Sequence, residues 1–193
     1  MSRWLPVLCA LSIGSLLGSC ATLSQEQCQA GDWRSIGVTD GVEGRPASYV
    51  SNHVDACAEY GIGLDQPLYQ AGRAEGLRTY CTLENAADVG LDGERYYGVC
   101  EGNVGVSFAR VHAAAERVYD LEAELNSIDS DIDRLARRLR QGGLSEGEAA
   151  ALAREIRSLQ RDSDSVRRQI RLADNRLRAI QREEQLRLAS AGA

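Results

Sequence analysis

The fold is decided by residues 128–159, which read IDSDIDRLARRLRQGGLSEGEAAALAREIRSL. On both sides of the glycine pair, apolar residues recur in steps of three and four, as in the heptads of coiled coils. Gly142 and Gly143 indicate the end of one helix, and Ser145 with Glu148 forms a capping box that starts the next. The stretch therefore predicts two helices joined by a short turn.

The same apolar pattern continues outward over residues 111–139 and 149–180. If the helices fold back on each other, nine layers pair residues whose numbers sum to 287 or 288, as in Ile132 with Ile156. This constant sum predicts an antiparallel hairpin within one chain, about 45 Å long at 1.5 Å per residue. A parallel coil between two chains is the alternative.

The N-terminus has the layout of a signal peptide. Arg3 precedes an apolar stretch over residues 4–17, and small residues follow before Cys20. A membrane-spanning helix needs about 20 apolar residues, more than this stretch supplies. Residues 1–19 are therefore predicted to be cleaved off.

The residues Leu17-Gly18-Ser19-Cys20 resemble the lipobox of bacterial lipoproteins, which predicts lipidation of Cys20. Several acyl chains give stable membrane anchoring, and residues 20–27 then form a short tether. By the same resemblance, Ala21 after the lipidated cysteine favours the outer membrane. The expected location is the cell envelope, anchored by lipid and facing the periplasm.

Four cysteines remain in the exported chain: Cys28, Cys57, Cys81 and Cys100. In an oxidising compartment they predict two structural disulfides. The pairs Cys28 to Cys57 and Cys81 to Cys100 are slightly favoured because each closes a local loop, although three connectivities are open. A zinc site is the rival interpretation, but the close C-x-x-C spacing typical of such sites is missing.

Composition divides the exported chain into two parts. Residues 28–108 are glycine-rich and contain the four cysteines, which predicts a small helical domain, whereas residues 109–189 form the hairpin and 190–193 a tail. Residues 21–110 contain 13 acidic residues and 6 arginines, a net charge of −7, whereas residues 111–193 contain 15 of each. These balances argue against a nucleic-acid partner. The predicted fold is all-α.

Glycines recur in the domain at a fixed shift. Gly37, Asp40, Gly41 and Val42 recur 35 residues later as Gly72, Glu75, Gly76 and Leu77, which suggests a two-copy helical repeat. Glycine inside a helix costs about 1 kcal/mol relative to alanine, so another interaction has to offset it. Glycines four apart lie on one helix face, and we expect them to allow close helix packing.

Four runs of the domain carry a resemblance to a known family: Cys28-x-x-Gly31-Asp32-Trp33-x-x-Ile36-Gly37-x-x-Asp40-Gly41, His53-x-x-x-Cys57, Tyr69-x-x-Gly72-Arg73-x-x-Gly76-Leu77-x-x-Tyr80-Cys81 and Tyr96-Tyr97-Gly98-Val99-Cys100. Together they resemble the domain-of-unknown-function 2799 family of bacterial lipoproteins, over residues 28 to about 108. The resemblance implies an envelope lipoprotein with a small cysteine-containing helical domain. It implies no known reaction and supplies no catalytic residues.

Two motifs of the domain could indicate a reaction site or a metal site. His53 and Cys57 stand four apart and could form an imidazole and thiol pair, but a bridged Cys57 cannot act as a nucleophile. There is no G-x-S-x-G elbow to expose a catalytic serine. The acidic residues Asp88, Asp92 and Glu94 suggest a calcium loop, yet their spacing fails that pattern and a solvated loop is favoured. We therefore expect no catalytic residue, metal or cofactor.

Seven aromatic residues in the domain are expected to form its core: Trp33, Tyr49, Tyr60, Tyr69, Tyr80, Tyr96 and Tyr97. Exposed on one surface, they would instead suit a cell-wall glycan. The leading prediction is a non-enzymatic envelope lipoprotein whose coiled-coil arm contacts a protein partner. A glycan-binding module is the alternative, and a small periplasmic hydrolase is a third hypothesis.

Overall fold

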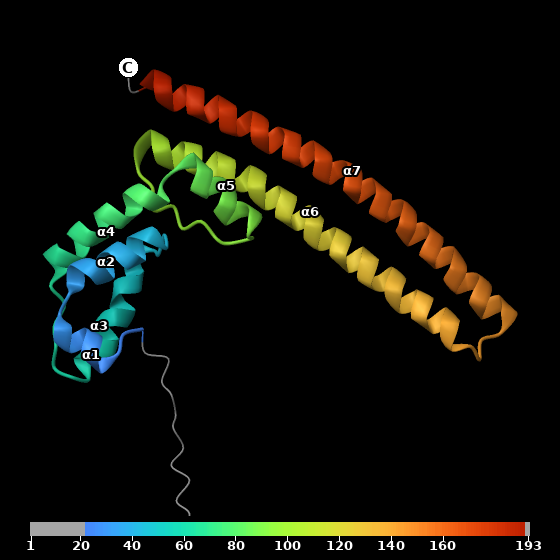
Figure 1. Cartoon of the computed structure of the whole chain (residues 1–193), viewed down its shortest axis with the longest axis horizontal. Coiled ribbons are helices and arrows are strands. Elements are labelled where there is room, and N and C mark those ends of the chain that lie inside the picture. The colour runs from blue at the N-terminus through green and yellow to red at the C-terminus, as the bar shows by residue number, and fades with distance from the viewer. Residues whose placement is uncertain (1–21, 192–193) are drawn as a thin grey trace, which may run out of the picture.

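The structure is a computed structural model that describes residues 22–191 (Figure 1). The predicted signal peptide, the predicted lipidation site Cys20 and the last two residues lie outside the described range. The helices are α1 (Gln25–Ala30), α2 (Trp33–Val42), α3 (Val50–Ala58), α4 (Gln66–Tyr80), α5 (Leu83–Leu91), α6 (Gly102–Gln141) and α7 (Glu146–Ala191), with a short 3-10 helix, η1 (Ala47–Tyr49). Over residues 22–191 there is no strand, which confirms the all-α prediction.

The short helices of the domain begin at side-chain caps. Ser24, Asp32, Asp65 and Thr82 each accept a hydrogen bond from the backbone N–H three residues later. Such caps satisfy N–H groups that have no partner within the first turn of a helix. Local sequence thus sets where α1, α2, α4 and α5 start.

Helices α2 and α4 pack against each other in parallel through the repeated glycines. Gly37 faces the backbone of Tyr69, and Gly41 faces that of Arg73 and Gly76, so the contact advances along both helices together. A Cβ atom on any of the four glycines would lie under 3.0 Å from a backbone oxygen of the other helix. This close approach confirms that the glycines serve packing.

Two disulfides join Cys28 to Cys57 and Cys81 to Cys100, the pairing that local loop closure favours. The first links α1 to α3 inside a core that includes Leu23, Trp33 and Tyr69. The second links the end of α4 to the segment before α6. Each disulfide therefore stabilises a different part of the domain.

The second core is shared between the domain and the hairpin. Phe108 and Val111 of α6 are fully buried and pack with Tyr80, with α5 and with Leu177 of α7. The sequence division at residue 108 falls inside this core, within an uninterrupted helix. The domain and the arm are therefore connected by α6 itself, without a linker.

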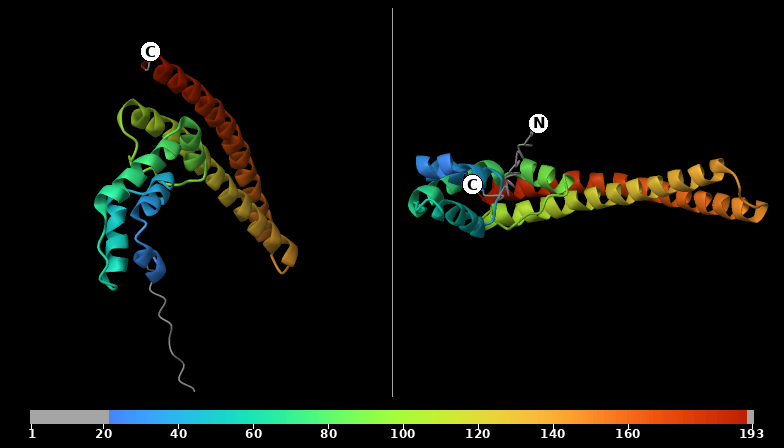
Figure 2. Two further views of the ribbon diagram at one scale, coloured as in Figure 1. Left: turned by 60° about the vertical axis from the view of Figure 1, so that its left-hand side comes forward. Right: turned by 90° about the horizontal axis from the view of Figure 1, so that it is seen from below.

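Helices α6 and α7 run antiparallel as a long hairpin (Figures 1 and 2). Gly142 and Gly143 both have positive φ at the turn, and Ser145 and Glu148 exchange the hydrogen bonds of the predicted capping box. The helices have 40 and 46 residues, about 60 and 69 Å at 1.5 Å per residue. They exceed the predicted 45 Å because both continue past the seam into the domain.

Candidate functional site

His53 is buried in a hydrogen-bonded cluster at the N-terminal end of the described chain. Its Nε2 lies 2.9 Å from Oδ2 of Asp40, and its Nδ1 lies 2.8 Å from the hydroxyl of Thr22. The hydroxyl of Tyr69 donates to the same oxygen of Asp40 at 2.6 Å. His53 is 4% exposed and Asp40 is 3% exposed, so the imidazole and the carboxylate are shielded from solvent.

The cluster explains why these polar groups can be buried. Burial raises the pKa of Tyr69 far above the ordinary tyrosine value, and the hydrogen bond to Asp40 adds to the shift. The phenol therefore stays protonated and donates its hydrogen bond. Because His53 joins Thr22 to α2 through Asp40, the cluster fixes the segment that leads from the N-terminus into the domain.

The four cysteines that the sequence offered as alternative zinc ligands, among them Cys57 of the possible imidazole and thiol pair, all lie in disulfides. In the described part of the chain, no three His, Cys, Asp or Glu side chains are placed to hold a metal ion. The acidic motif is not a single loop as expected. Asp88 lies on α5, because Thr82 caps a helix that continues to Leu91, and only Asp92 and Glu94 follow that helix.

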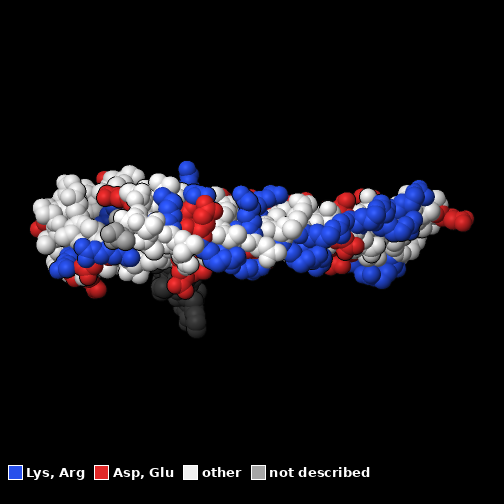
Figure 3. All heavy atoms as spheres, turned by 90° about the horizontal axis from the view of Figure 1, so that it is seen from above, with Lys and Arg blue, Asp and Glu red and all other residues white. Residues whose placement is uncertain are grey.

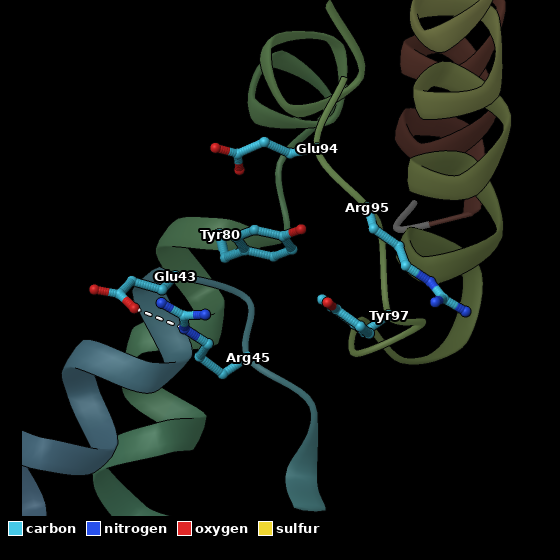
Figure 4. Close-up of a pocket in the computed structure, with 6 residues that line it drawn as sticks. All are labelled: Glu43, Arg45, Tyr80, Glu94, Arg95 and Tyr97. Atoms are coloured by element: carbon cyan, nitrogen blue, oxygen red, sulfur yellow. Dashed lines mark hydrogen bonds and ion pairs between the residues drawn. The ribbon is translucent and has the colours of Figure 1, made fainter. Parts of the chain in front are cut away.

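A polar cavity of about 400 Å³ lies between the end of α2 and the segment after α5 (Figure 4). Glu43 and Arg45 form an ion pair on one side, while Tyr80 and Tyr97 present their rings. Burial, with the neighbouring Tyr96 as a lesser cause, raises the pKa of Tyr80 to about 12. The phenol of Tyr80 therefore remains protonated at neutral pH.

The aromatic residues are divided between core and surface. Trp33, Tyr69 and Tyr80 are at most 5% exposed, as the core prediction requires, whereas Tyr60 and Tyr97 are 40% and 51% exposed. Arg95 stacks over the ring of Tyr97 at 5.5 Å. The aromatic set therefore does not form one continuous stacking surface.

The base of the arm contains a buried charge network that the sequence analysis missed. Glu184 of α7 is fully buried, and its Oε2 accepts hydrogen bonds from Ser107 Oγ and Arg187 Nε, both at 2.7 Å. Arg110 forms an ion pair with the other carboxylate oxygen. Burial alone would raise the pKa of Glu184, but these hydrogen bonds and charges outweigh it and lower the pKa.

This network fastens the C-terminal end of α7 to the first turns of α6. Arg187 also donates to the hydroxyl of Ser107 at 2.6 Å and to the carbonyl of Asn103 at 3.2 Å. A second polar layer lies halfway along the arm, where buried Ser163 donates to Asp129 and accepts from Arg167. Both layers fix the position of one helix against the other.

The arrangement defines a class of protein: an all-α, disulfide-stapled domain that continues without a break into a helical hairpin. Residues 32–117 match the sequence model described as "Protein of unknown function (DUF2799)", the family that the motifs of the domain predicted. The match extends from Asp32, the cap of α2, to Arg117 in α6. No curated protein and no solved structure matches the chain. Among residues 22–191, no helix combines the length and apolar character needed to cross a membrane.

Proposed function

We propose that the protein is a non-enzymatic lipoprotein of the cell envelope, in which the domain holds the base of an arm that contacts a protein partner. The observation that carries this proposal is the continuity of α6, whose first turns lie in the domain core and whose remaining turns form the arm. A helix shared in this way transmits a fixed orientation from the domain to the arm.

The buried polar groups support a structural role for the domain. Both nitrogens of His53 have hydrogen-bond partners, and the cluster joins Thr22 to α2. The Cys28 to Cys57 disulfide and the buried side chain of Leu23 hold the same end of the chain. A lipid at Cys20 would therefore be attached close to a rigid body.

In vivo photocrosslinking tests this proposal. A benzophenone amino acid is introduced at Asn126, exposed on the arm, and in a matched variant at Glu59, exposed on the domain. We expect a discrete protein adduct from the arm position and from further exposed positions of α6, but none from Glu59. If a scan of the arm gives no adduct while the domain position does, the arm is not the contact surface and the proposal is wrong.

A further inference from the structure

The outer face of α7 carries a long row of arginines. In the heptad register of the seam, ten positions between residues 154 and 185 are b or f positions, two of the three kinds that face away from α6. Seven of the ten are arginine and one is aspartate, Asp164, so this face has a net charge of +6. We call these seven exposed residues the arginine face: Arg154, Arg157, Arg161, Arg168, Arg171, Arg178 and Arg182. Figure 3, seen from the α7 side, shows basic side chains along most of the arm.

The arginine face has no carboxylate partner within the described structure. Two arginines of α7 beside the seam are paired, Arg167 with Asp129 and Arg187 with Glu184. For residues 22–191, none of the eight ion pairs includes a residue of the arginine face. Arg178 donates to the side-chain oxygen of Asn175 at 2.9 Å, and no carboxylate of the described chain neutralises the seven guanidinium groups.

Solubility alone does not account for this distribution. On the opposite side of the arm, the same heptad positions of α6 between residues 116 and 140 hold Glu116, Asp133, Arg137, Arg140 and four uncharged residues, a net charge of zero. The chain has no lysine, so a preference for arginine explains the choice of cation. It does not explain why the cations gather on one of two equally exposed faces.

The shape of the arginine face favours a narrow, linear ligand. From Arg154 to Arg182 it extends about 42 Å at 1.5 Å per residue, and it is one helix wide. Large apolar side chains beside it are confined to Leu172 and Leu186, 68% and 73% exposed. The core of a protein interface is apolar and depleted of charge, and the arginine face has no such core. A polymer with regularly spaced anions would contact the whole row.

The position of the face indicates where such a polymer lies. Helix α1, at the start of the described chain, is at the end of the domain away from α7 (Figures 1 and 2). In the orientation set by the proposed lipid anchor, on which this inference rests, the arginine face points away from the anchoring membrane. We propose that the arginine face binds the carboxylates of cell-wall peptidoglycan. Each guanidinium group can donate two parallel hydrogen bonds to one carboxylate.

Cosedimentation with purified peptidoglycan sacculi tests this binding, using the full-length protein purified in detergent. The test variant combines Arg161→Gln, Arg168→Gln and Arg171→Gln. The matched control makes the same charge change on α6 with Arg137→Gln, Arg138→Gln and Arg140→Gln, which are exposed and outside every ion pair of the described chain. We expect the test variant to lose about tenfold in affinity, as three weak ionic contacts would predict, and the control to bind like the wild type.

Two further experiments identify the ligand. Sacculi whose carboxylates have been amidated should no longer bind the wild type, and vesicles of phosphatidylglycerol should not replace sacculi. Equal binding to amidated sacculi, equal loss in both triple variants, no sacculus binding at all, or arginine-dependent binding to vesicles alone would each overturn the inference. Because this assay is independent of protein crosslinks from the arm, its failure is distinguishable from failure of the proposed function.

Discussion

Replacing Gly72 with alanine tests the parallel contact between α2 and α4. The new Cβ would lie under 3.0 Å from the backbone carbonyl of Arg34, which cannot move unless α2 moves with it. Alanine would add about 1 kcal/mol of helix propensity, whereas overpacking against backbone costs about 3 kcal/mol at the upper end of its usual range. We expect the free energy of unfolding to fall by about 2 kcal/mol.

The measurement is urea unfolding followed by tryptophan fluorescence, because Trp33 lies on α2 and is only 3% exposed. Gly147→Ala is the control: this glycine lies in the first turn of α7 with no neighbouring atom within 4 Å of a new Cβ. That change should leave stability equal or slightly higher. A Gly72→Ala protein as stable as the wild type would mean that α2 and α4 do not meet through their backbones.

Four further outcomes are expected. Cys81→Ser should lower stability by about 2 to 5 kcal/mol in non-reducing urea unfolding, and four free thiols in the native protein would contradict the bridges. Cys20→Ala should abolish acyl labelling, and undiminished labelling would exclude lipidation there. Val118→Cys combined with Ile170→Cys should crosslink within a monomer on mild oxidation, whereas crosslinks found only between chains would contradict the hairpin. At neutral pH, Glu184→Gln should lower the free energy of unfolding by about 2 kcal/mol. Because the pKa of Glu184 is lowered by folding, its contribution should be lost as the pH falls below the ordinary glutamate range, and a pH-independent difference would refute this.

The hairpin could be predicted from sequence because its signals are local and repeated. Heptads, a glycine turn and a capping box each depend on residues close together in the chain. The glycine spacing predicted close packing for the same reason. It could not give the parallel direction of α2 and α4, which depends on how the connection between them folds.

The buried polar layers of the arm could not be predicted in the same way, although the heptad pattern places a polar residue at each of them. Ser163 and Glu184 both continue the seam column of α7 that contains Ile156 and Leu177, at intervals of seven residues. A serine or a carboxylate there is either a weak layer or the centre of a polar network, and the difference depends on partners from α6. The partners of Glu184, Ser107 and Arg110, are more than 70 residues away in sequence.

The His53 cluster could not be predicted from the sequence for the same reason. Its spacing to Cys57 suggested a reactive pair, but both partners of its ring, Asp40 and Thr22, come from other elements. The ring thus joins the N-terminal segment to α2, while the Glu184 network joins the two ends of the hairpin. Polar side chains buried at these two joints cost free energy unless every partner is in place, so each joint favours one arrangement of the helices over others. The direction of the arm, and with it the side on which the arginine face points, is set at the second core, where Tyr80 of α4 packs with Phe108 and Val111 of the unbroken helix α6.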